Sequence, residues 1–313
     1  MTPEISVVIP AFNALRLLPE TLNALKAQTF QNWEAVIVDD GSSDGTAAWL
    51  RAEARIDPRI HPIISENGGP SRARDKGVAY SSAPLIAFLD ADDIWHDNRL
   101  TRLVETFEAR PETSVLYSRV SFFRNDPGRP RAVSGILPRP ATVEDLLRAN
   151  PTCTMSNVAV RKEDFLNSGG FDPMIVYGED REWLVRMAAS GARIEGLNEI
   201  LAQYRLVDGG LSTNLEGMRE GWRASLATAQ RLGVAPPEWK VEQAEADHLR
   251  YLARRALRLN APPRVAARYA LESFIHAPLM ALSNLRRVGL VLFAAMAAPL
   301  IPGRVRRALF TGA

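Results

Sequence analysis

Residues 85–93 read Leu-Ile-Ala-Phe-Leu-Asp-Ala-Asp-Asp, a continuous apolar run that ends in three carboxylates. Continuous apolar runs of this length are typical of strands that are buried on both faces, as in a parallel sheet covered by helices. The run at residues 35–38 has the same character and also ends in acid, at Asp39 and Asp40. The run at residues 5–9 is near-continuous, with Ser6 as its one polar residue. The three runs predict the buried strands of an α/β domain.

Segments with helical spacing separate these apolar runs. Helices are predicted at residues 17–25, 46–54, 71–80 and 100–109, with a further strand at residues 60–64. Repeated β-α units predict a mostly parallel sheet with helices on both faces. In the middle third, residues 143–149 and 179–189 are predicted to be helical, and residues 155–160 to form a strand.

Length and composition exclude several classes of protein. The chain of 313 residues is long enough for two domains, and its apolar and charged fractions are those of a globular protein. The single cysteine, Cys153, excludes an intramolecular disulfide and argues against a cysteine-based metal site. The four histidines show no metal-ligand spacing. The first residues lack the basic segment of a signal peptide, so we expect the protein to stay in the cytoplasm.

The chain becomes helical and basic after about residue 213. From Arg250 to the end it carries eleven arginines and one acidic residue, Glu272, which predicts contact with an anionic surface. No nucleic-acid-binding fold is recognisable there, so we favour a membrane. The apolar run at residues 288–298 is short and bounded by arginines, which is typical of an element lying on the inner face of the plasma membrane; a helix buried against the main domain is the alternative.

Acidic residues gather where two predicted strands end. Open parallel sheets bind their ligands at the carboxyl ends of the strands, and Asp39, Asp40, Asp90, Asp92 and Asp93 all follow such strands. Neighbouring carboxylates repel each other unless a cation or a ligand rich in donors joins them. A diphosphate carried by Mg²⁺ or Mn²⁺ meets both demands. An isolated Asp-x-Asp is usually a solvated loop, so its position directly after a strand is what gives it weight.

Six motifs follow one another along the first two-thirds of the chain. They are Val7-Val8-Ile9-Pro10-Ala11-Phe12-Asn13, Val38-Asp39-Asp40-Gly41-Ser42-Ser43-Asp44-Gly45-Thr46, Asn67-Gly68-Gly69-Pro70-Ser71-Arg72-Ala73-Arg74-Asp75-Lys76-Gly77, Phe88-Leu89-Asp90-Ala91-Asp92-Asp93, Gly169-Gly170-Phe171-Asp172 and Tyr177-Gly178-Glu179-Asp180. In this order they resemble family 2 glycosyltransferases of the GT-A fold. The resemblance implies a Rossmann-like GT-A domain, with a nucleotide-sugar half at residues 1–105 and an acceptor half at residues 106–213. A helical appendage would follow at residues 214–313.

The resemblance also implies a site for the nucleotide. Phe12, with Pro10 and Asn13 beside it in the first motif, would pack on the base, although a phenylalanine here can equally be a core residue. Asp40 would accept a hydrogen bond from the base, typically uracil, and Asp39 is the less favoured of the pair. A UDP-sugar is therefore the expected donor, by the habit of the family.

The charged parts of the donor would meet three further residues. Arg74 would balance the diphosphate near the start of a helix, a region favourable to anions. Asp92 would hold Mn²⁺ or Mg²⁺, and Asp90 would contact the ribose or the metal. Two other acids have simpler interpretations, since Asp44 and Asp93 can each cap the segment that follows.

The expected chemistry is displacement at the anomeric carbon. The attacking hydroxyl has a high pKa and needs a base, while the departing diphosphate needs a cation. The resemblance makes Asp180 the general base and gives Glu179 a part in positioning the acceptor; in the family this arrangement accompanies inversion. The alternative is that both acids only complement the dipole at the start of a helix.

The sequence departs from the family pattern in two places and lacks a further motif. An acid, Asp75, stands where the family has the asparagine of Arg-Asn-x-Gly. Val207 stands where many relatives have the histidine of Tyr-Arg-x-His, so Arg205, Asp208 or a loop backbone would have to replace a metal or pyrophosphate contact. The Gln-x-x-Arg-Trp motif of processive synthases is absent, which predicts transfer of single sugars.

The leading hypothesis is transfer of one sugar from a UDP-sugar to a hydroxyl of a saccharide or a lipid-linked glycan, with residues 277–313 on an anionic membrane. A nucleotidyltransferase that makes sugar nucleotides is the first alternative, but it would need a glycine-rich basic loop after the first strand, where residues 10–13 read Pro-Ala-Phe-Asn. A degenerate scaffold or binding protein is the second. The missing histidine motivates it, and the intact Asp92 and Asp180 argue against it.

Overall fold

The computed structural model describes residues 2–207, 209–210, 213–278, 293–295, 297 and 301. The chain forms two compact units, the first made of Met1–Thr142 with Pro151–Val207 and the second of Val143–Asn150 with Asp208–Ala313. The short helix predicted at residues 143–149 thus belongs with the C-terminal helices, although it lies between segments of the first unit in the sequence. The predicted ligand-binding halves of residues 1–105 and 106–213 contribute strands to one sheet.

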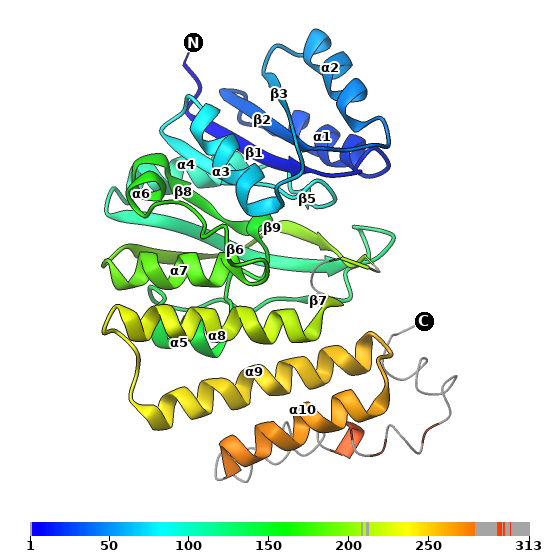
Figure 1. The fold of residues 1–313 in the computed structure, drawn as a ribbon. Coiled ribbons are helices and arrows are strands. Elements are labelled where there is room, and N and C mark those ends of the chain that lie inside the picture. The colour runs from blue at the N-terminus through cyan, green and yellow to red at the C-terminus, as the bar shows by residue number, and fades with distance from the viewer. Residues whose placement is uncertain are drawn as a thin grey trace. The chain divides into compact units, whose positions relative to one another are not determined.

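The first unit is an α/β domain (Figure 1). Its strands are β1 (Ile5–Ala11), β2 (Trp33–Asp40), β3 (Ile60–Ser65), β4 (Leu85–Phe88), β5 (Ile94–Trp95), β6 (Thr113–Phe123), β7 (Ala132–Val133), β8 (Ala159–Arg161) and β9 (Arg193–Arg205). Its helices are α1 (Leu18–Lys26), α2 (Thr46–Ile56), α3 (Pro70–Tyr80), α4 (Arg99–Ala109), α6 (Lys162–Asn167) and α7 (Glu179–Ala189), with a 3₁₀ turn η1 (Met155–Asn157).

Among the described residues these strands form one sheet in the order β3-β2-β1-β4-β8-β6-β9-β5, with β7 paired to β6. The pairs β3-β2, β2-β1 and β1-β4 are parallel, as is the pair β6-β9. The strand β8 lies antiparallel between β4 and β6. The predicted α/β class with a mostly parallel sheet is confirmed.

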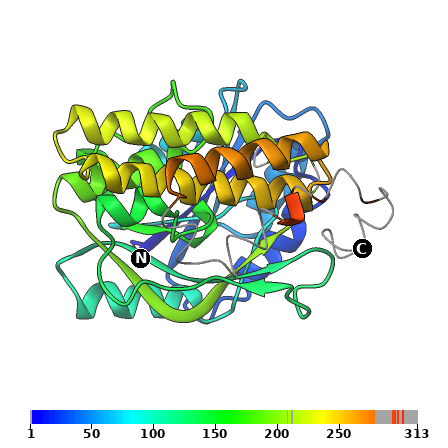
Figure 2. The same cartoon turned by 90° about the horizontal axis from the view of Figure 1, so that it is seen from below.

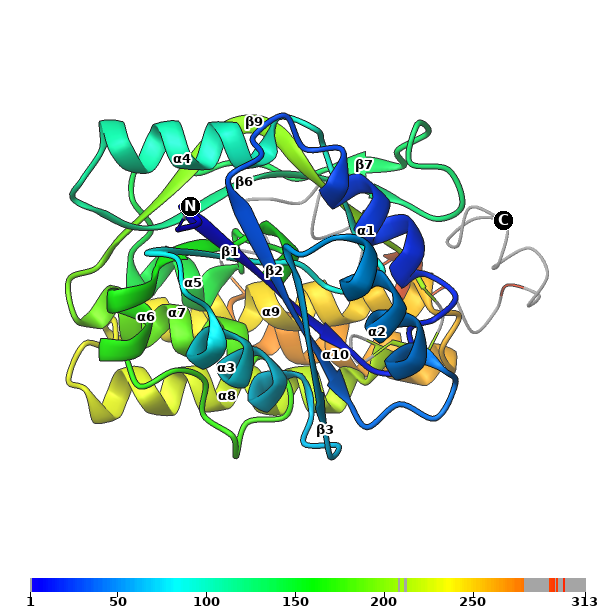
Figure 3. The same ribbon diagram turned by 90° about the horizontal axis from the view of Figure 1, so that it is seen from above.

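Alternation of side chains along the buried strands creates two cores. On one face, Val7, Ile9 and Ile37 belong to a core that also contains Leu22 of α1 and Leu103 of α4. On the other face, Val36 and Val38 pack on Ala73 of α3, and an aromatic cluster joins Phe88 to Phe165, Phe171 and Trp183. Figure 3 shows α3 on one side of β1–β3, with α1 and α2 on the other.

The strand predicted at residues 155–160 is wrong over its first half. Thr154 accepts a hydrogen bond from the backbone N–H of Ser156 and caps η1, so the strand β8 begins only at Ala159. The buried Asn157 accepts a hydrogen bond from the backbone N–H of Ser118 at 3.0 Å and donates to the carbonyl of Thr152 at 3.0 Å. Because these buried polar side chains bond to neighbouring backbone groups, a tight turn replaces the ladder that the apolar pattern suggested.

The second unit is helical, as the sequence predicts. It contains α5 (Val143–Arg148), α8 (Leu215–Arg231), α9 (Glu238–Arg258) and α10 (Pro263–His276), of which the last three lie side by side (Figure 2). Leu249 and Leu252 of α9 share a core with Tyr269 and Ala270 of α10. The indole N–H of Trp222 donates to the carbonyl of Leu147 at 2.7 Å, which ties α8 to α5.

Most of the predicted membrane element at residues 277–313 lies outside the described residues. Of the apolar run at residues 288–298, Ala295 is buried in the core of α9 and α10, while Phe293 is exposed. Within the part of the chain that is described, every helix is too short or too polar to cross a bilayer.

The close approach of α3 to β1 gives a test of this packing. A Cβ atom on Gly77 would lie 2.4 Å from Cγ1 of Val8, so Gly77→Ala should lower the free energy of unfolding by about 1–3 kcal/mol, the usual cost of overpacking. Urea denaturation would measure the change. Gly135→Ala is the control, because a Cβ there meets no atom within 4 Å. If both variants were equally stable, the contact between α3 and β1 would be looser than described.

Candidate active site

The two aspartates that end β2 have different environments. The carboxylate of Asp40 accepts hydrogen bonds from the backbone N–H groups of Gly68 and Gly69, each at 2.8 Å, and so fixes the loop between β3 and α3. Asp39 is buried, and its Oδ1 atom has no hydrogen-bond partner among the described residues. A buried acceptor without a donor costs about 1–3 kcal/mol, so a donor from a ligand would be favourable there. The hydrogen bond from the nucleotide base to Asp40 rather than to Asp39 stays a prediction.

The loop after β1 presents an aromatic ring to solvent. Phe12 is 54% exposed, which rules out the alternative of a core residue. The next residue, Asn13, accepts a hydrogen bond from the backbone N–H of Ser43 at 2.9 Å and holds this loop against the loop after β2. Asp44 caps α2 by accepting from the backbone N–H of Thr46 at 3.0 Å, as its position predicted. Pro10 lies in β1 immediately before this loop.

Three of the predicted site residues meet at a buried guanidinium. Arg74 of α3 donates through Nη1 to Oε1 of Glu179 at 2.9 Å and through Nη2 to Oδ1 of Asp90 at 2.7 Å. Burial alone would lower the pKa of Arg74, but the carboxylates of Asp90 and Glu179 together raise it above its usual value. The guanidinium therefore joins the end of β4 to the start of α7, and its predicted contact with a diphosphate stays a prediction.

Two hydroxyl residues complete the acidic end of β4. Oδ2 of Asp90 accepts from the hydroxyl of Thr154 at 3.1 Å, and the backbone N–H of Asp90 donates to the hydroxyl of Ser156 at 2.9 Å. The buried Asp93 accepts from Ser156 at 2.6 Å and from the backbone N–H of Arg205 at 2.8 Å. Asp93 therefore joins β9 to η1 instead of capping the next segment. Sequence reasoning missed Thr154 and Ser156, which carry no motif.

Asp92 is the acid in this cluster with the fewest partners. Burial and the neighbouring charge of Asp90 raise its pKa, and no described side chain donates a hydrogen bond to it. Over the described residues, no three His, Cys, Asp or Glu side chains are placed to hold a metal ion together. The available donor set is thus carboxylate oxygen from Asp92, with Asp90 beside it. This set suits Mg²⁺ or Mn²⁺ only if phosphate oxygens or water complete the coordination.

Val207 stands where many relatives have a histidine, and Arg205 is one of the residues expected to replace that side chain. Its Nε atom donates to the carbonyl of Asp92 at 2.8 Å, and its Nη2 atom pairs with Glu20 at 2.7 Å. A cation therefore lies against the backbone of the acidic cluster, which fits Arg205 as a replacement for the missing side chain. Asp208, the other candidate, lies outside the described residues.

The pair of acids that begins α7 is divided between two environments. Glu179 is buried, and burial raises its pKa although Arg74 opposes the shift. Asp180 is less buried, and its Oδ1 atom accepts from the backbone N–H of Arg181 at 2.8 Å. This contact agrees with a helix-start role and does not exclude catalysis, so Asp180 as the general base remains a prediction.

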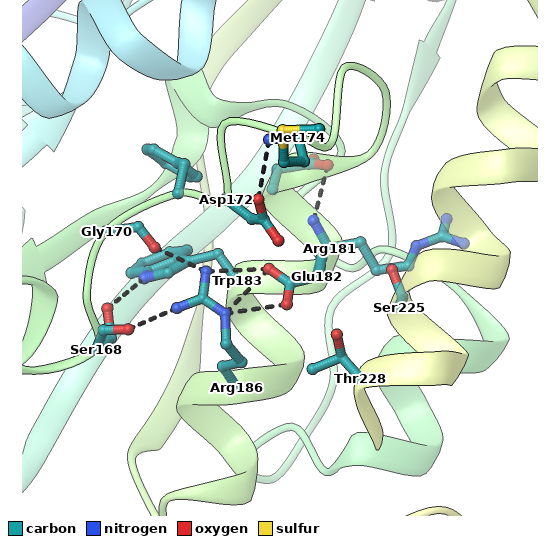
Figure 4. Close-up of polar contacts among 12 residues, drawn as sticks. Ser168, Gly170, Asp172, Met174, Arg181, Glu182, Trp183, Arg186, Ser225 and Thr228 are labelled. Carbon is teal, nitrogen blue, oxygen red and sulfur yellow. Dashed lines mark hydrogen bonds and ion pairs between the residues drawn. The ribbon is translucent and has the colours of Figure 1, made fainter. Parts of the chain in front are cut away.

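The segment before α7 is held in place by a buried ion pair (Figure 4). Arg186 donates to the carbonyl of Ser168 at 2.6 Å and to that of Gly170 at 2.7 Å, while Glu182 pairs with it at 3.0 Å. The indole N–H of Trp183 donates to the hydroxyl of Ser168 at 2.9 Å. One face of α7 thus orders the turn that precedes the segment leading to Glu179.

Asp75 holds the same turn from the side of α3. Its Oδ1 atom accepts from the backbone N–H of Phe171 at 3.2 Å. A Cβ atom on Gly170, where φ is +70°, would lie 2.7 Å from this oxygen, so glycine is required. The acid makes the bond that an amide oxygen could also make. Burial raises the pKa of Asp75 to about 6, and the nearby charges of Arg186 and Arg74 only moderate the shift.

Comparison with known proteins identifies the family of the chain. The family model Glycosyl transferase family 2 matches residues 6–167. The putative teichuronic acid biosynthesis glycosyltransferase TuaG of Bacillus subtilis is 31% identical, over 72% of this chain and 86% of TuaG. The UDP-Glc:alpha-D-GlcNAc-diphosphoundecaprenol beta-1,3-glucosyltransferase WfgD of Escherichia coli is 26% identical, over 67% of this chain and 80% of WfgD.

Solved structures share the fold. TarS residues 1–349 of S. aureus, in complex with UDP-GlcNAc, has a TM-score of 0.63 at 17% identity, over 99% of this chain and 89% of that one. The mannosyltransferase PcManGT of Pyrobaculum calidifontis, in complex with GDP-Man and Mn²⁺, has a TM-score of 0.60 at 20% identity, over 98% and 88%. The chain belongs to glycosyl transferase family 2, and its fold is that of the GT-A enzymes.

The environment of Asp75 predicts how stability depends on pH. Its carboxyl ionises near pH 6 in the folded protein and near pH 4 in the unfolded chain, so the folded state binds more protons between these values. This group therefore makes the protein less stable as pH rises from 4 to 6. Asp75→Asn should raise the free energy of unfolding at pH 7.5 by roughly 1–3 kcal/mol and by much less at pH 4, as measured by urea denaturation.

Asp164→Asn is the control for this comparison, because Asp164 is also half-buried and lies in another helix of the same unit, α6. A gain for Asp75→Asn that was equal at both pH values would show that the raised pKa is not its cause.

Proposed function

We propose that the protein transfers one sugar, with inversion, from a UDP-sugar to a hydroxyl group of a lipid-linked or free saccharide. The observation that carries the proposal is the contact of Arg74 with both Asp90 and Glu179. It assembles acids from the end of β4 and the start of α7 beside Asp92, at the edge of the sheet where α/β domains bind ligands. An inactive scaffold would not need this assembly, and a nucleotidyltransferase would need a glycine-rich basic loop where residues 10–13 read Pro-Ala-Phe-Asn.

The donor side of the site is built from β1, β2 and the loop before α3. The exposed ring of Phe12 is available to stack on a base, a contact that planar rings favour. Asp39 or Asp40 would accept from the base, and Pro10 and Asn13 shape the edge next to Phe12. UDP is preferred to GDP because UDP-Glc appears in the name of WfgD and UDP-GlcNAc is bound to TarS, while GDP-Man is bound to PcManGT.

The reaction divides between the two acidic ends of the site. Asp180 would remove the proton of the acceptor hydroxyl, a role that contributes about 10² to 10⁴ in rate. Glu179 keeps the start of α7 in position through its bond to Arg74. A bound Mn²⁺ or Mg²⁺ on Asp92, with Asp90 beside it, would offset the charge of the departing diphosphate. The absence of the processive motif supports transfer of a single sugar.

The acceptor and the membrane belong to the same proposal. The name of WfgD includes a diphosphoundecaprenol acceptor, and that of TuaG includes teichuronic acid biosynthesis. Lipid-linked acceptors lie at a membrane, and the arginines after Arg250 would bring the enzyme to the anionic inner face of the plasma membrane. We assign this contact to residues 277–313.

Calorimetric titration with UDP, GDP, dTDP and CDP, with and without Mn²⁺, tests the donor and the metal. We expect UDP to bind in the presence of Mn²⁺, and Asp92→Asn to weaken that binding at least about tenfold by removing a metal ligand. Asp180→Asn should bind UDP as the native chain does, while transferring sugar about 10² to 10⁴ times more slowly.

Asp97→Asn is the matched control for Asp92→Asn, because Asp97 is an exposed acid a few residues further along the same segment. If GDP bound tightly and UDP did not, the proposed donor would change to a GDP-sugar, and the proposed class of enzyme would stay the same. If no nucleotide bound, with or without metal, the proposal would be wrong, and the chain would be a degenerate scaffold or binding protein instead.

Flotation with phosphatidylglycerol-containing vesicles tests the membrane contact. The complete chain should float with anionic vesicles, and a chain ending at His276 should stay in the soluble fraction, because it has lost five arginines together with the apolar run at residues 288–298. Neutral phosphatidylcholine vesicles are the control and should bind neither protein. Equal flotation of both proteins would place the contact outside residues 277–313.

A further inference from the structure

A pocket of about 390 Å³ opens beside the loop that Asp40 fixes. One wall is the start of α3 with the loop before it, including Asn67, Ser71 and Arg72; the other wall is formed by Pro173, Ile175 and Val176. The residues individually assigned to the donor do not line this pocket; they are Pro10, Phe12, Asn13, Asp39, Asp40, Arg74, Asp90 and Asp92. The pocket is nevertheless adjacent to the donor site, because Gly68 and Gly69 line it and bond to Asp40.

The second wall belongs to residues 171–179, and side chains of α3 form hydrogen bonds with both ends of this segment. Asp75 accepts a hydrogen bond from the backbone N–H of Phe171 at 3.2 Å, and the preceding residue, Arg74, donates to Glu179 at 2.9 Å. Within the segment, the side chain of Asp172 accepts from the backbone N–H of Met174 at 2.9 Å, which closes a turn that Figure 4 shows. Residues 171–179 therefore form an ordered loop and end at the acids proposed to activate the acceptor.

The tip of this ordered loop is apolar and faces solvent. Met174 is 85% exposed and Val176 is 59% exposed, and Ile175 and Pro173 complete an uninterrupted apolar run. Exposed apolar side chains beside a pocket are typical of surfaces that a ligand covers, because removing them from water is favourable. Met174 does not line the pocket but lies between Pro173 and Ile175, which do, and a methionine side chain adapts its shape to a flexible hydrocarbon chain.

The opposite wall supplies positive charge. The side chain of Arg72 is exposed, and among the described residues no carboxylate is paired with it. Asn67 and Ser71 add groups that can donate hydrogen bonds. The pocket thus combines a cationic, hydrogen-bonding wall with an apolar wall, which matches a molecule whose anionic group is attached to a hydrocarbon chain.

We propose that this pocket binds the acceptor where its phosphate joins its hydrocarbon chain, with the phosphate at Arg72 and the chain against Ile175 and Val176. The inference rests on the proposed function and selects the lipid-linked acceptor over the free saccharide. The acceptor sugar would extend toward Asp180, four residues beyond Val176 in the same segment.

Calorimetric titration with farnesyl diphosphate, below the concentration at which it forms micelles, tests the pocket. The complete chain is first saturated with UDP and Mn²⁺, so that the diphosphate cannot enter the donor site. Farnesyl diphosphate should bind at least about tenfold more tightly than either farnesol or inorganic diphosphate. Val176→Asp places a charge against the chain and Arg72→Ala removes the cation, and each should weaken binding by about tenfold or more.

Two matched variants control for general effects of charge and exposure. Leu166→Asp changes an apolar residue of α6 that is 53% exposed and does not line the pocket, and Arg51→Ala removes an exposed arginine from α2. Both should bind farnesyl diphosphate as the native chain does. No binding by the native chain, unchanged binding by Val176→Asp, or equal losses in Val176→Asp and Leu166→Asp would each overturn the pocket assignment.

Binding of UDP is measured on the same samples and separates this inference from the proposed function. Unchanged UDP affinity in Val176→Asp and Arg72→Ala shows that the fold and the donor site are intact. A native chain that fails to bind UDP counts against the proposed donor, while the contrast between Val176→Asp and Leu166→Asp still decides the pocket.

Discussion

Arg74 carries a positive charge inside the first unit, and two carboxylates from distant parts of the chain keep it there. Asp90 follows β4 and Glu179 begins α7, so one side chain of α3 joins the region proposed for the donor to the region proposed for the acceptor. Removing the guanidinium would leave the buried Glu179 without its cation, and breaking a buried ion pair in this way typically destabilises a protein by about 3–5 kcal/mol. The close contact of Gly77 with β1 brings α3 near enough to the sheet for this arrangement.

Around that ion pair, the loops of the site are held by one recurring interaction. Asp40, Asp75 and Asp93 each accept hydrogen bonds from backbone N–H groups of a different loop or strand end, and Asp44 does the same for the loop after β1. Such charge-assisted bonds are stronger than neutral ones and order a backbone that lacks a sheet partner. The loops are thereby preorganised before a ligand arrives, which lowers the entropy that binding must overcome.

The core elements were predictable from the sequence because their signal is local. The runs at residues 35–38 and 85–89 are apolar without interruption, and the run at residues 5–9 is interrupted only by Ser6. This composition is typical of strands that are buried on both faces. The strand predicted at residues 155–160 was wrong over residues 155–157, where hydroxyl and amide side chains bond to nearby backbone groups. An apolar pattern does not reveal those bonds, because the partners of Asn157 include Ser118, which is distant in sequence.

The sequence by itself determined the family, the mostly parallel character of the sheet and the set of acids that gather at its edge. Only the tertiary structure decided how those acids divide their work: Asp93 became a structural tie between β9 and η1, while Asp92 kept a carboxylate with few partners. It also brought residues 67–72 opposite residues 173–176 to form a pocket. The physical reason is that an aspartate's role depends on burial and on the donors within about 3 Å, and the fold sets both.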